Sequence, residues 1–68
     1  MKFKVGDIVI VKGNSAIMEV ECEDEFLTFF LNKLHWSCIS IRYDTIFDSY
    51  TEDEMRLATQ EEIEEYLS

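Results

Sequence analysis

The sequence predicts a mainly β protein: a small barrel, or strongly bent sheet, of five or six short antiparallel strands with a short α-helix at the C-terminus. Three observations lead to this prediction. The 68 residues form one domain, because a chain of this length buries only about 60% of its surface on folding. Hydrophobic residues make up 47% of the chain, which is enough for a packed core. Short apolar segments alternate with clusters of turn-forming residues.

Two strands are predicted in the first third of the chain, at residues 5–12 and 16–23. The first contains the β-branched run Ile8–Val11 and ends at the turn-forming residues 13–15. The second alternates strictly, so its apolar side chains should face the core and its glutamates the solvent. The apolar set is Met18, Val20 and Cys22, and the glutamates are Glu19, Glu21 and Glu23.

Four more segments complete the predicted β structure. After an acidic turn at residues 23–25, residues 26–31 are predicted as a third strand that is covered on both faces, because almost every position is apolar. A fourth strand is predicted at residues 35–43, a fifth at 46–50 and a short last strand at 55–58. We expect the core to be formed by Ile8, Ile10, Met18, Val20, Leu27, Phe29, Ile39, Ile41 and Leu57.

The C-terminal segment changes from a two-residue period to a helical one, which predicts a helix over residues 59–67. Thr59 and Glu62 match a capping box, in which each side chain bonds the backbone N–H of the other residue. The apolar side chains that follow recur at spacings of three and four: Ile63, Tyr66 and Leu67. A helix this short is unstable alone in water, so Ile63 and Leu67 should dock it on the barrel.

Three segments of the chain carry a family resemblance. Lys4–Lys12 places a Gly-Asp pair before a hydrophobic strand, and Ile17–Val20 follows with a Met-x-Val pattern. This opening resembles that of the small YodC-like proteins of bacteria and phage. Trp36–Ile39 is loosely similar to their aromatic-and-Cys strand, and Tyr50–Thr59 to the closing segments of small SH3-like barrels. The resemblance implies an SH3-like barrel and no catalytic residues, since the family has no assigned chemistry.

Charge and composition disfavour several classes of function. Fifteen Asp and Glu against six Lys and Arg give a formal net charge of −9, so the chain lacks the positive charge that phosphate backbones or anionic membranes attract. The longest apolar runs are four residues, too short for a membrane span, and no signal peptide is visible. We therefore expect a cytoplasmic protein in which Cys22 and Cys38 are reduced.

The sequence shows no recognisable catalytic or metal site. Cys22, His35 and Cys38 are the only soft ligands, and residues three apart in a strand, such as His35 and Cys38, point to opposite faces. The carboxylates occur in solvated runs without an apolar pocket to raise their pKa. Phosphate-binding loops and nucleophile elbows are missing from the sequence. We expect no enzyme activity, no metal and no cofactor.

The acidic residues are concentrated in two segments. Residues 19–25 contain five acids and no base, and residues 44–68 contain nine acids and one base. Such segments keep a small domain soluble, or they form a surface that recognises a basic partner. Exposed tyrosines beside them would act as contact anchors. The candidate partner-binding residues are Glu19, Glu21, Glu23, Asp24, Glu25, Tyr50, Glu52, Asp53, Glu54 and Tyr66.

These features predict a small acidic, non-enzymatic protein–protein interaction module. One alternative is a phage-type inhibitor that mimics DNA, using its acidic face against a basic nucleic-acid-binding protein. A second alternative is a nucleic-acid-binding barrel whose aromatic side chains stack on bases, but Lys33 and Arg42 are the only bases near those aromatics, which disfavours nucleic acid. A homodimer stays open, because a chain this short exposes apolar edges. No membrane partner is expected.

Overall fold

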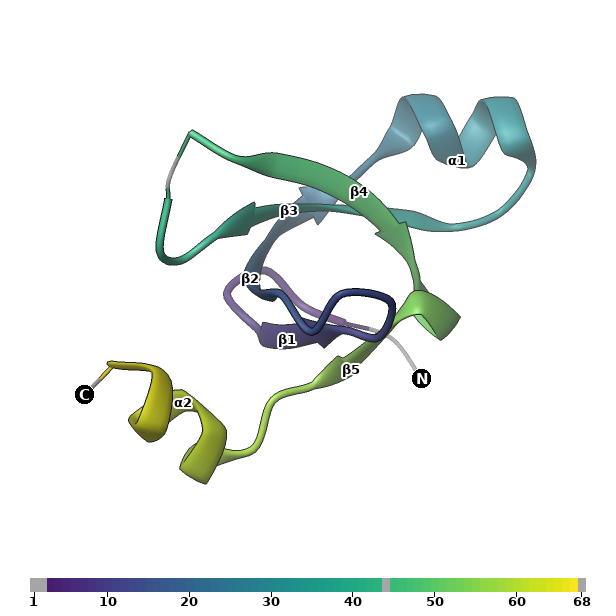
Figure 1. Ribbon diagram of the computed structural model, residues 1–68. Helices are drawn as coiled ribbons and strands as arrows, with labels where there is room; N and C mark the ends of the chain where they lie inside the picture. Colours follow the sequence, from purple (N-terminus) through teal and green to yellow (C-terminus); the bar gives the residue numbers. More distant parts are fainter. Residues whose placement is uncertain (1–2, 44, 68) are drawn as a thin grey trace.

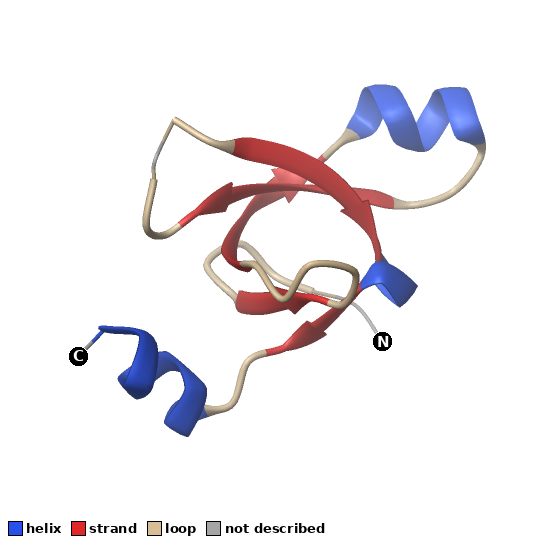
Figure 2. Ribbon diagram, viewed as in Figure 1, coloured by secondary structure: helices blue, strands red, loops and turns tan. Residues whose placement is uncertain are grey.

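Five short strands form one antiparallel sheet with the order β4-β3-β2-β1-β5 (Figure 1). The computed structural model describes residues 3–43 and 45–67. The strands are β1 (Ile8–Val11), β2 (Ile17–Glu23), β3 (His35–Ser40), β4 (Phe47–Thr51) and β5 (Met55–Leu57). The helices are α1 (Glu25–Leu31), the 3₁₀ turn η1 (Glu52–Glu54) and α2 (Gln60–Leu67), all visible in Figure 2. The predicted mainly β fold with a short C-terminal helix is confirmed.

The sheet is open and curls so that its two ends approach each other (Figure 1). Strands β1 to β4 pair in sequence order, and η1 then carries the chain across to place β5 beside β1. Within the described residues no ladder joins β4 to β5, so the strands form a strongly bent open sheet and not a closed barrel.

The core fills the inner face of this curled sheet. Val9 opposite Met18 and Val20 opposite Cys38 form its centre, and their side chains are almost fully buried. The remaining buried members are Phe3, Val11, Trp36 and Met55. The rings of Phe3 and Trp36 meet edge to face with centroids 6.1 Å apart.

In β1 and β3 the structure buries the residues opposite to those predicted. Met18 and Val20 are buried as expected, but the inward residues of the other two strands are Val9, Val11, Trp36 and Cys38. The predicted core positions Ile8, Ile10, Ile39 and Ile41 are only half-buried, and Leu57 is exposed. All four residues of β1 are β-branched, so alternation in the sequence does not show which pair faces inward.

The predicted third strand at residues 26–31 is wrong, because this segment forms the helix α1. Asp24 is its N-cap, and the Leu27 N–H donates to Asp24 Oδ1 at 3.0 Å. Asn32 ends the helix in the left-handed conformation, with φ 54°. Phe29 is thus exposed rather than buried, and Leu27 is half-buried.

Cys22 does not belong to the buried stripe of β2. The register between β2 and β3 shifts between Val20 and Cys22, which indicates a bulge at Glu21. The bulge breaks the two-residue alternation, and Cys22 lies exposed together with Glu21 and Glu23.

Helix α2 begins with the predicted capping box but docks differently from the prediction. The Glu62 N–H donates to Thr59 Oγ1 at 3.1 Å, and the Thr59 N–H donates to Glu62 Oε1 at 2.9 Å. Ile63 is half-buried, whereas Leu67 is 70% exposed and does not hold the helix on the barrel. The main polar attachment is instead the ion pair between Arg56 of β5 and Glu62, at 2.7 Å.

The outer edge of β4 is covered by carboxylates. The Ser40 N–H donates to the Ile46 carbonyl at 2.8 Å, which places the N–H groups of Ser49 and Thr51 on the side of β4 away from β3. The Ser49 N–H donates to Asp48 Oδ1 and the Thr51 N–H donates to Glu54 Oε1, both at 2.8 Å. These two donors are thereby satisfied without another strand.

The inward orientation of Val9 can be tested by comparing the same change, valine to alanine, at a buried and at an exposed position. Val9 is fully buried, so Val9→Ala should lower the free energy of unfolding by about 2 kcal/mol through lost burial and a cavity. Val5 is 73% exposed, so Val5→Ala should change it by less than about 0.5 kcal/mol. Chemical denaturation followed by circular dichroism measures both values, and equal effects would contradict the assigned face of β1.

Candidate functional site

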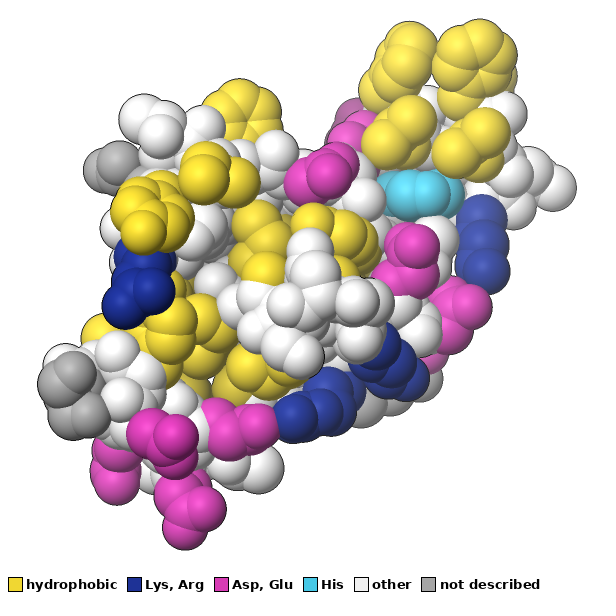
Figure 3. Space-filling view, in the orientation of Figure 1, with side chains coloured by type: hydrophobic (Ala, Val, Ile, Leu, Met, Phe, Trp, Pro, Cys, Tyr) yellow, Lys and Arg dark blue, Asp and Glu magenta, His cyan; other side chains and the backbone are white. Residues whose placement is uncertain are grey.

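Helix α1 exposes four large apolar side chains, here called the α1 phenylalanine surface: Phe26, Phe29, Phe30 and Leu31. They are 60–88% exposed. In Figure 3 they form the yellow group at the upper right, where Figure 1 shows α1. A helix of seven residues with four such side chains in solvent is an apolar patch of the kind that marks interaction sites.

Helix α1 is held at defined points although it buries none of its residues. The His35 N–H donates to Thr28 Oγ1 at 2.9 Å, which joins the middle of the helix to β3. The Ser49 hydroxyl donates to Asp24 Oδ2, which joins the N-cap to β4. The rings of Phe26 and Phe30 pack edge to face with centroids 5.3 Å apart. The apolar surface is therefore presented in one orientation.

Four of the predicted contact residues lead into α1 or begin it. Glu21, Glu23 and Glu25 are exposed, and Glu25 lies in the first turn of the helix. Asp24 has a structural role instead, because its hydrogen bonds to the Ser49 side chain and the Leu27 N–H lower its pKa. Glu19 is half-buried on the outer face of β2, between Ile8 and Ile39.

The acidic residues of η1 also have partners within the chain. Glu54 Oε1 accepts the Thr51 N–H and forms the capping box of η1. Asp53 accepts the Thr51 hydroxyl at 2.7 Å and pairs with Lys33 Nζ at 3.3 Å, and these bonds lower its pKa. Glu52 is half-buried. In the view of Figure 3 the acidic side chains form separate groups rather than one continuous face.

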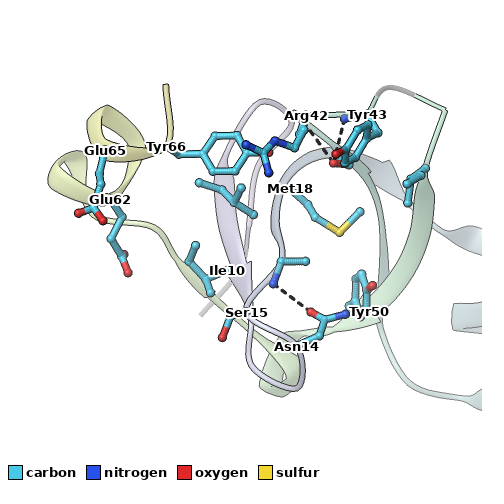
Figure 4. Close-up of a pocket in the computed structure, with 14 residues that line it drawn as sticks. Ile10, Asn14, Ser15, Met18, Arg42, Tyr43, Tyr50, Glu62, Glu65 and Tyr66 are labelled. Carbon is cyan, nitrogen blue, oxygen red and sulfur yellow. Dashed lines mark hydrogen bonds between the residues drawn. The ribbon is translucent and has the colours of Figure 1, made fainter. Parts of the chain in front are cut away.

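A second site, here called the tyrosine pocket, lies between the sheet and α2 and has a volume of about 790 Å³ (Figure 4). All three tyrosines of the chain line it: Tyr43, Tyr50 and Tyr66. The apolar and small polar wall consists of Ile10, Asn14, Ser15, Ala16, Ile17, Met18, Ser40 and Ile46. The charged lining residues are Arg42, Glu62 and Glu65.

The tyrosine pocket brings together two predicted contact residues, Tyr50 and Tyr66, and adds Arg42 and Tyr43, which are not among the predicted partner-binding residues. The Arg42 guanidinium carbon lies 5.5 Å from the Tyr66 ring centroid and 6.0 Å from the Tyr43 centroid. Figure 4 shows Arg42 between these two rings. Burial raises the pKa of Tyr50, and the negative charge of Asp48 adds to this effect.

The soft ligands considered in the sequence do not meet. His35 and Cys38 are both buried in β3, and their odd spacing directs them to opposite faces. His35 Nδ1 is 2.6 Å from the Lys33 carbonyl oxygen. Within residues 3–43 and 45–67, no group of three His, Cys, Asp or Glu side chains is placed to hold a metal ion. In the same part of the chain no helix has the length and hydrophobicity to cross a membrane.

The two thiols should differ in reactivity. Burial raises the pKa of Cys38 to about 11, whereas Cys22 is exposed. At pH 8 we expect iodoacetamide to modify one thiol in the native protein and two in denaturant, counted by mass spectrometry. Cys22→Ser should leave the native protein unmodified. Rapid modification of that variant would contradict the burial of Cys38.

The attachment of α2 should depend on pH. Hydrogen bonds from Arg56 and the Thr59 N–H lower the pKa of Glu62 from 4.5 to about 2. The ion pair thus stabilises the fold above pH 4.5, and its contribution is lost as the pH falls toward 2. An NMR titration of the Glu62 side chain should give a midpoint near 2 that rises toward 4.5 in Arg56→Leu. A midpoint near 4.5 in the unmodified chain would contradict the pairing.

Comparison of the chain with protein-family models, with curated proteins and with solved structures gives no match. The likeness of the opening strand to the YodC-like proteins stays a prediction of the sequence. The structure itself offers two candidate contact sites, the α1 phenylalanine surface and the tyrosine pocket.

Proposed function

We propose that the chain is a non-enzymatic protein–protein interaction module that docks through the α1 phenylalanine surface. The observation that carries this proposal is the exposure of 60–88% at four large apolar side chains of one anchored helix. Transferring one such side chain from water to an apolar environment contributes about 1.5–3 kcal/mol. Four of them on one short helix supply the apolar anchors that dominate binding energy at protein interfaces.

The occupant that fits this surface is a different protein with an apolar groove bordered by Lys and Arg. Helix α1 inserts as a short amphipathic element, as in helix-in-groove recognition. Glu23 and Glu25 flank its N-terminus and are exposed, so they favour basic residues at the border of the groove. A second copy of the chain would bring together two molecules with a net charge of −9 each, and their repulsion disfavours self-association.

The DNA-mimic alternative needs carboxylates that are available to replace phosphates. Asp24, Asp53, Glu54 and Glu62 all bond to groups of their own chain. Breaking these bonds would weaken α1, η1 or the attachment of α2. The intramolecular bonds favour a contact that is apolar at its centre and acidic only at its border.

Site-specific photo-crosslinking tests the proposal with two phenylalanines of comparable exposure. Benzoylphenylalanine replaces Phe29, on α1, or Phe47, which is 69% exposed at the start of β4, in cells that naturally express the chain. Position 29 should give one discrete adduct with another protein. Mass spectrometry should place the cross-linked peptide in an apolar groove with Lys or Arg at its border, and position 47 should give no such adduct.

Two further variants test the charge beside the helix and the independence of the fold from Phe29. The double variant Glu23→Lys, Glu25→Lys should reduce the adduct at position 29 several-fold, because it reverses the charge beside the helix. An adduct between two copies of the chain, the same adduct at both positions, or no adduct at position 29 would each contradict the proposal. Phe29→Ser should leave the melting temperature within about 2 °C of the original, since this side chain contributes little to the core.

A further inference from the structure

We infer that the tyrosine pocket is a second binding site, which takes an arginine side chain from a basic peptide segment and holds its guanidinium over the ring of Tyr50. This site is independent of the proposed function of α1. Figure 1 shows α1 and α2 on opposite sides of the sheet, and the pocket lies on the side of α2.

The pocket has the size and the lining of a ligand site. Its volume of about 790 Å³ lies within the range of about 300–1,000 Å³ that is usual for such sites. Three segments each contribute one tyrosine: the β3–β4 connection, β4 and α2. Met18 and Ile17 contribute apolar side chains to the wall. Aromatic faces above an apolar wall suit an arginine side chain, because the guanidinium stacks on a ring and the alkyl stem packs against the apolar wall.

The pocket already contains one contact of the proposed kind. The Arg42 guanidinium lies over Tyr66 and near Tyr43, at 5.5 Å and 6.0 Å from the ring centroids. Two of the three rings are therefore engaged by a cation of the chain itself. Within the described residues no cation lies over the third ring, Tyr50. A second guanidinium can occupy that ring without displacing Arg42.

Tyr50 is held in place for this contact. Its ring packs against the core on one side and lines the pocket. Asn14 also lines the pocket, and Figure 4 shows its side chain beside the Tyr50 ring. A fixed ring loses little conformational entropy when a ligand stacks on it, which favours binding.

The charges around the pocket favour a cation. Asp48 precedes Tyr50 by two residues in β4, so both side chains project from the same face of the strand. Glu62 and Glu65 line the pocket, and Arg42 is the only base among its described lining residues. The net charge of −9 adds a long-range attraction for basic segments. An anionic ligand would be repelled by Asp48 and by the net negative charge of the chain.

Titration with matched peptides tests the inference by ¹⁵N–¹H NMR at low salt. The probe is the acetylated, amidated peptide Gly-Arg-Gly-Arg-Gly, and the comparison peptides carry Lys or Glu in place of both arginines. The arginine peptide should shift the amide signals of Asn14 and Tyr50 most. It should bind more tightly than the lysine peptide, because a guanidinium stacks better on an aromatic face. The glutamate peptide should not bind.

Variants of Tyr50 and Asp48 assign the contact. Tyr50→Leu should lower the affinity for the arginine peptide about fivefold. Tyr50→Phe keeps the ring face, so it should lower the affinity less than about twofold. Asp48 is exposed, so Asp48→Asn leaves the core intact and should weaken binding of the arginine peptide without loss of folding. Phe29→Ser should change nothing, which separates this site from the α1 phenylalanine surface.

Several results would overturn the inference. Unchanged affinity in Tyr50→Leu would exclude Tyr50 as the platform. Shifts spread evenly over all acidic segments would indicate non-specific charge attraction, and equal affinity for the lysine peptide would exclude the stacked guanidinium. Binding of the glutamate peptide at Arg42 would make the pocket an anion site instead.

Discussion

The carboxylate of Asp24 joins three parts of the structure, and the orientation of α1 depends on it. One oxygen caps the helix through the Leu27 N–H, and the other accepts the Ser49 hydroxyl of β4. The Asp24 backbone N–H also donates to the His35 carbonyl of β3 at 2.8 Å. A single residue therefore ends β2, begins α1 and fixes both against the neighbouring strands. Without this cap, residues 26–31 would lose the signal that starts a helix.

The small size of the core explains why the apolar side of α1 faces outward. A small set of buried side chains fills the inner face of the curled sheet, and the rings of Trp36 and Phe3 pack edge to face among them. Three further phenylalanines, Phe26, Phe29 and Phe30, lie outside this core and are exposed. The chain places them on a helix outside the barrel, where only Thr28 and Leu27 turn toward the sheet. A small domain with many aromatics thus has apolar surface to offer a partner.

Local signals in the sequence were sufficient for much of the fold but not for its faces. The capping box of Thr59 and Glu62 and the alternation at Met18 and Val20 predicted α2 and β2 correctly, because both depend on neighbours in the chain. The inward side of β1 depends on contacts with β2 and β5, which no local pattern contains.

Residues 26–31 were ambiguous for a similar reason. An almost continuous apolar run fits a buried strand and a short helix equally well, and the deciding groups are Asp24 before it and Asn32 after it.

The candidate sites, too, could be predicted only as far as they depend on neighbours in the sequence, and not where they depend on contacts made by the fold. Tyr50 and Tyr66 were identified by their acidic neighbours, but only the folded chain places them in one pocket with Tyr43 and Arg42. The α1 phenylalanine surface was missed because the same residues were assigned to the interior. The hydrogen bonds that the Thr51 hydroxyl donates to Asp53 and Glu54 likewise form only because the chain turns after β4. In the sequence, the negative charge of these two residues indicates only that they face solvent.

The carboxylates along the outer edge of β4 bear on how such a chain stays in solution. An uncovered strand edge and four exposed apolar side chains on one small molecule would together favour stacking of strands between molecules. Asp48 and Glu54 occupy the hydrogen-bond donors that an incoming strand would need, and they place negative charge beside that edge. Two of the acidic side chains thus occupy backbone donors that pairing with another strand would use. A strand that added to this edge of β4 would have to break both hydrogen bonds and approach the two carboxylates.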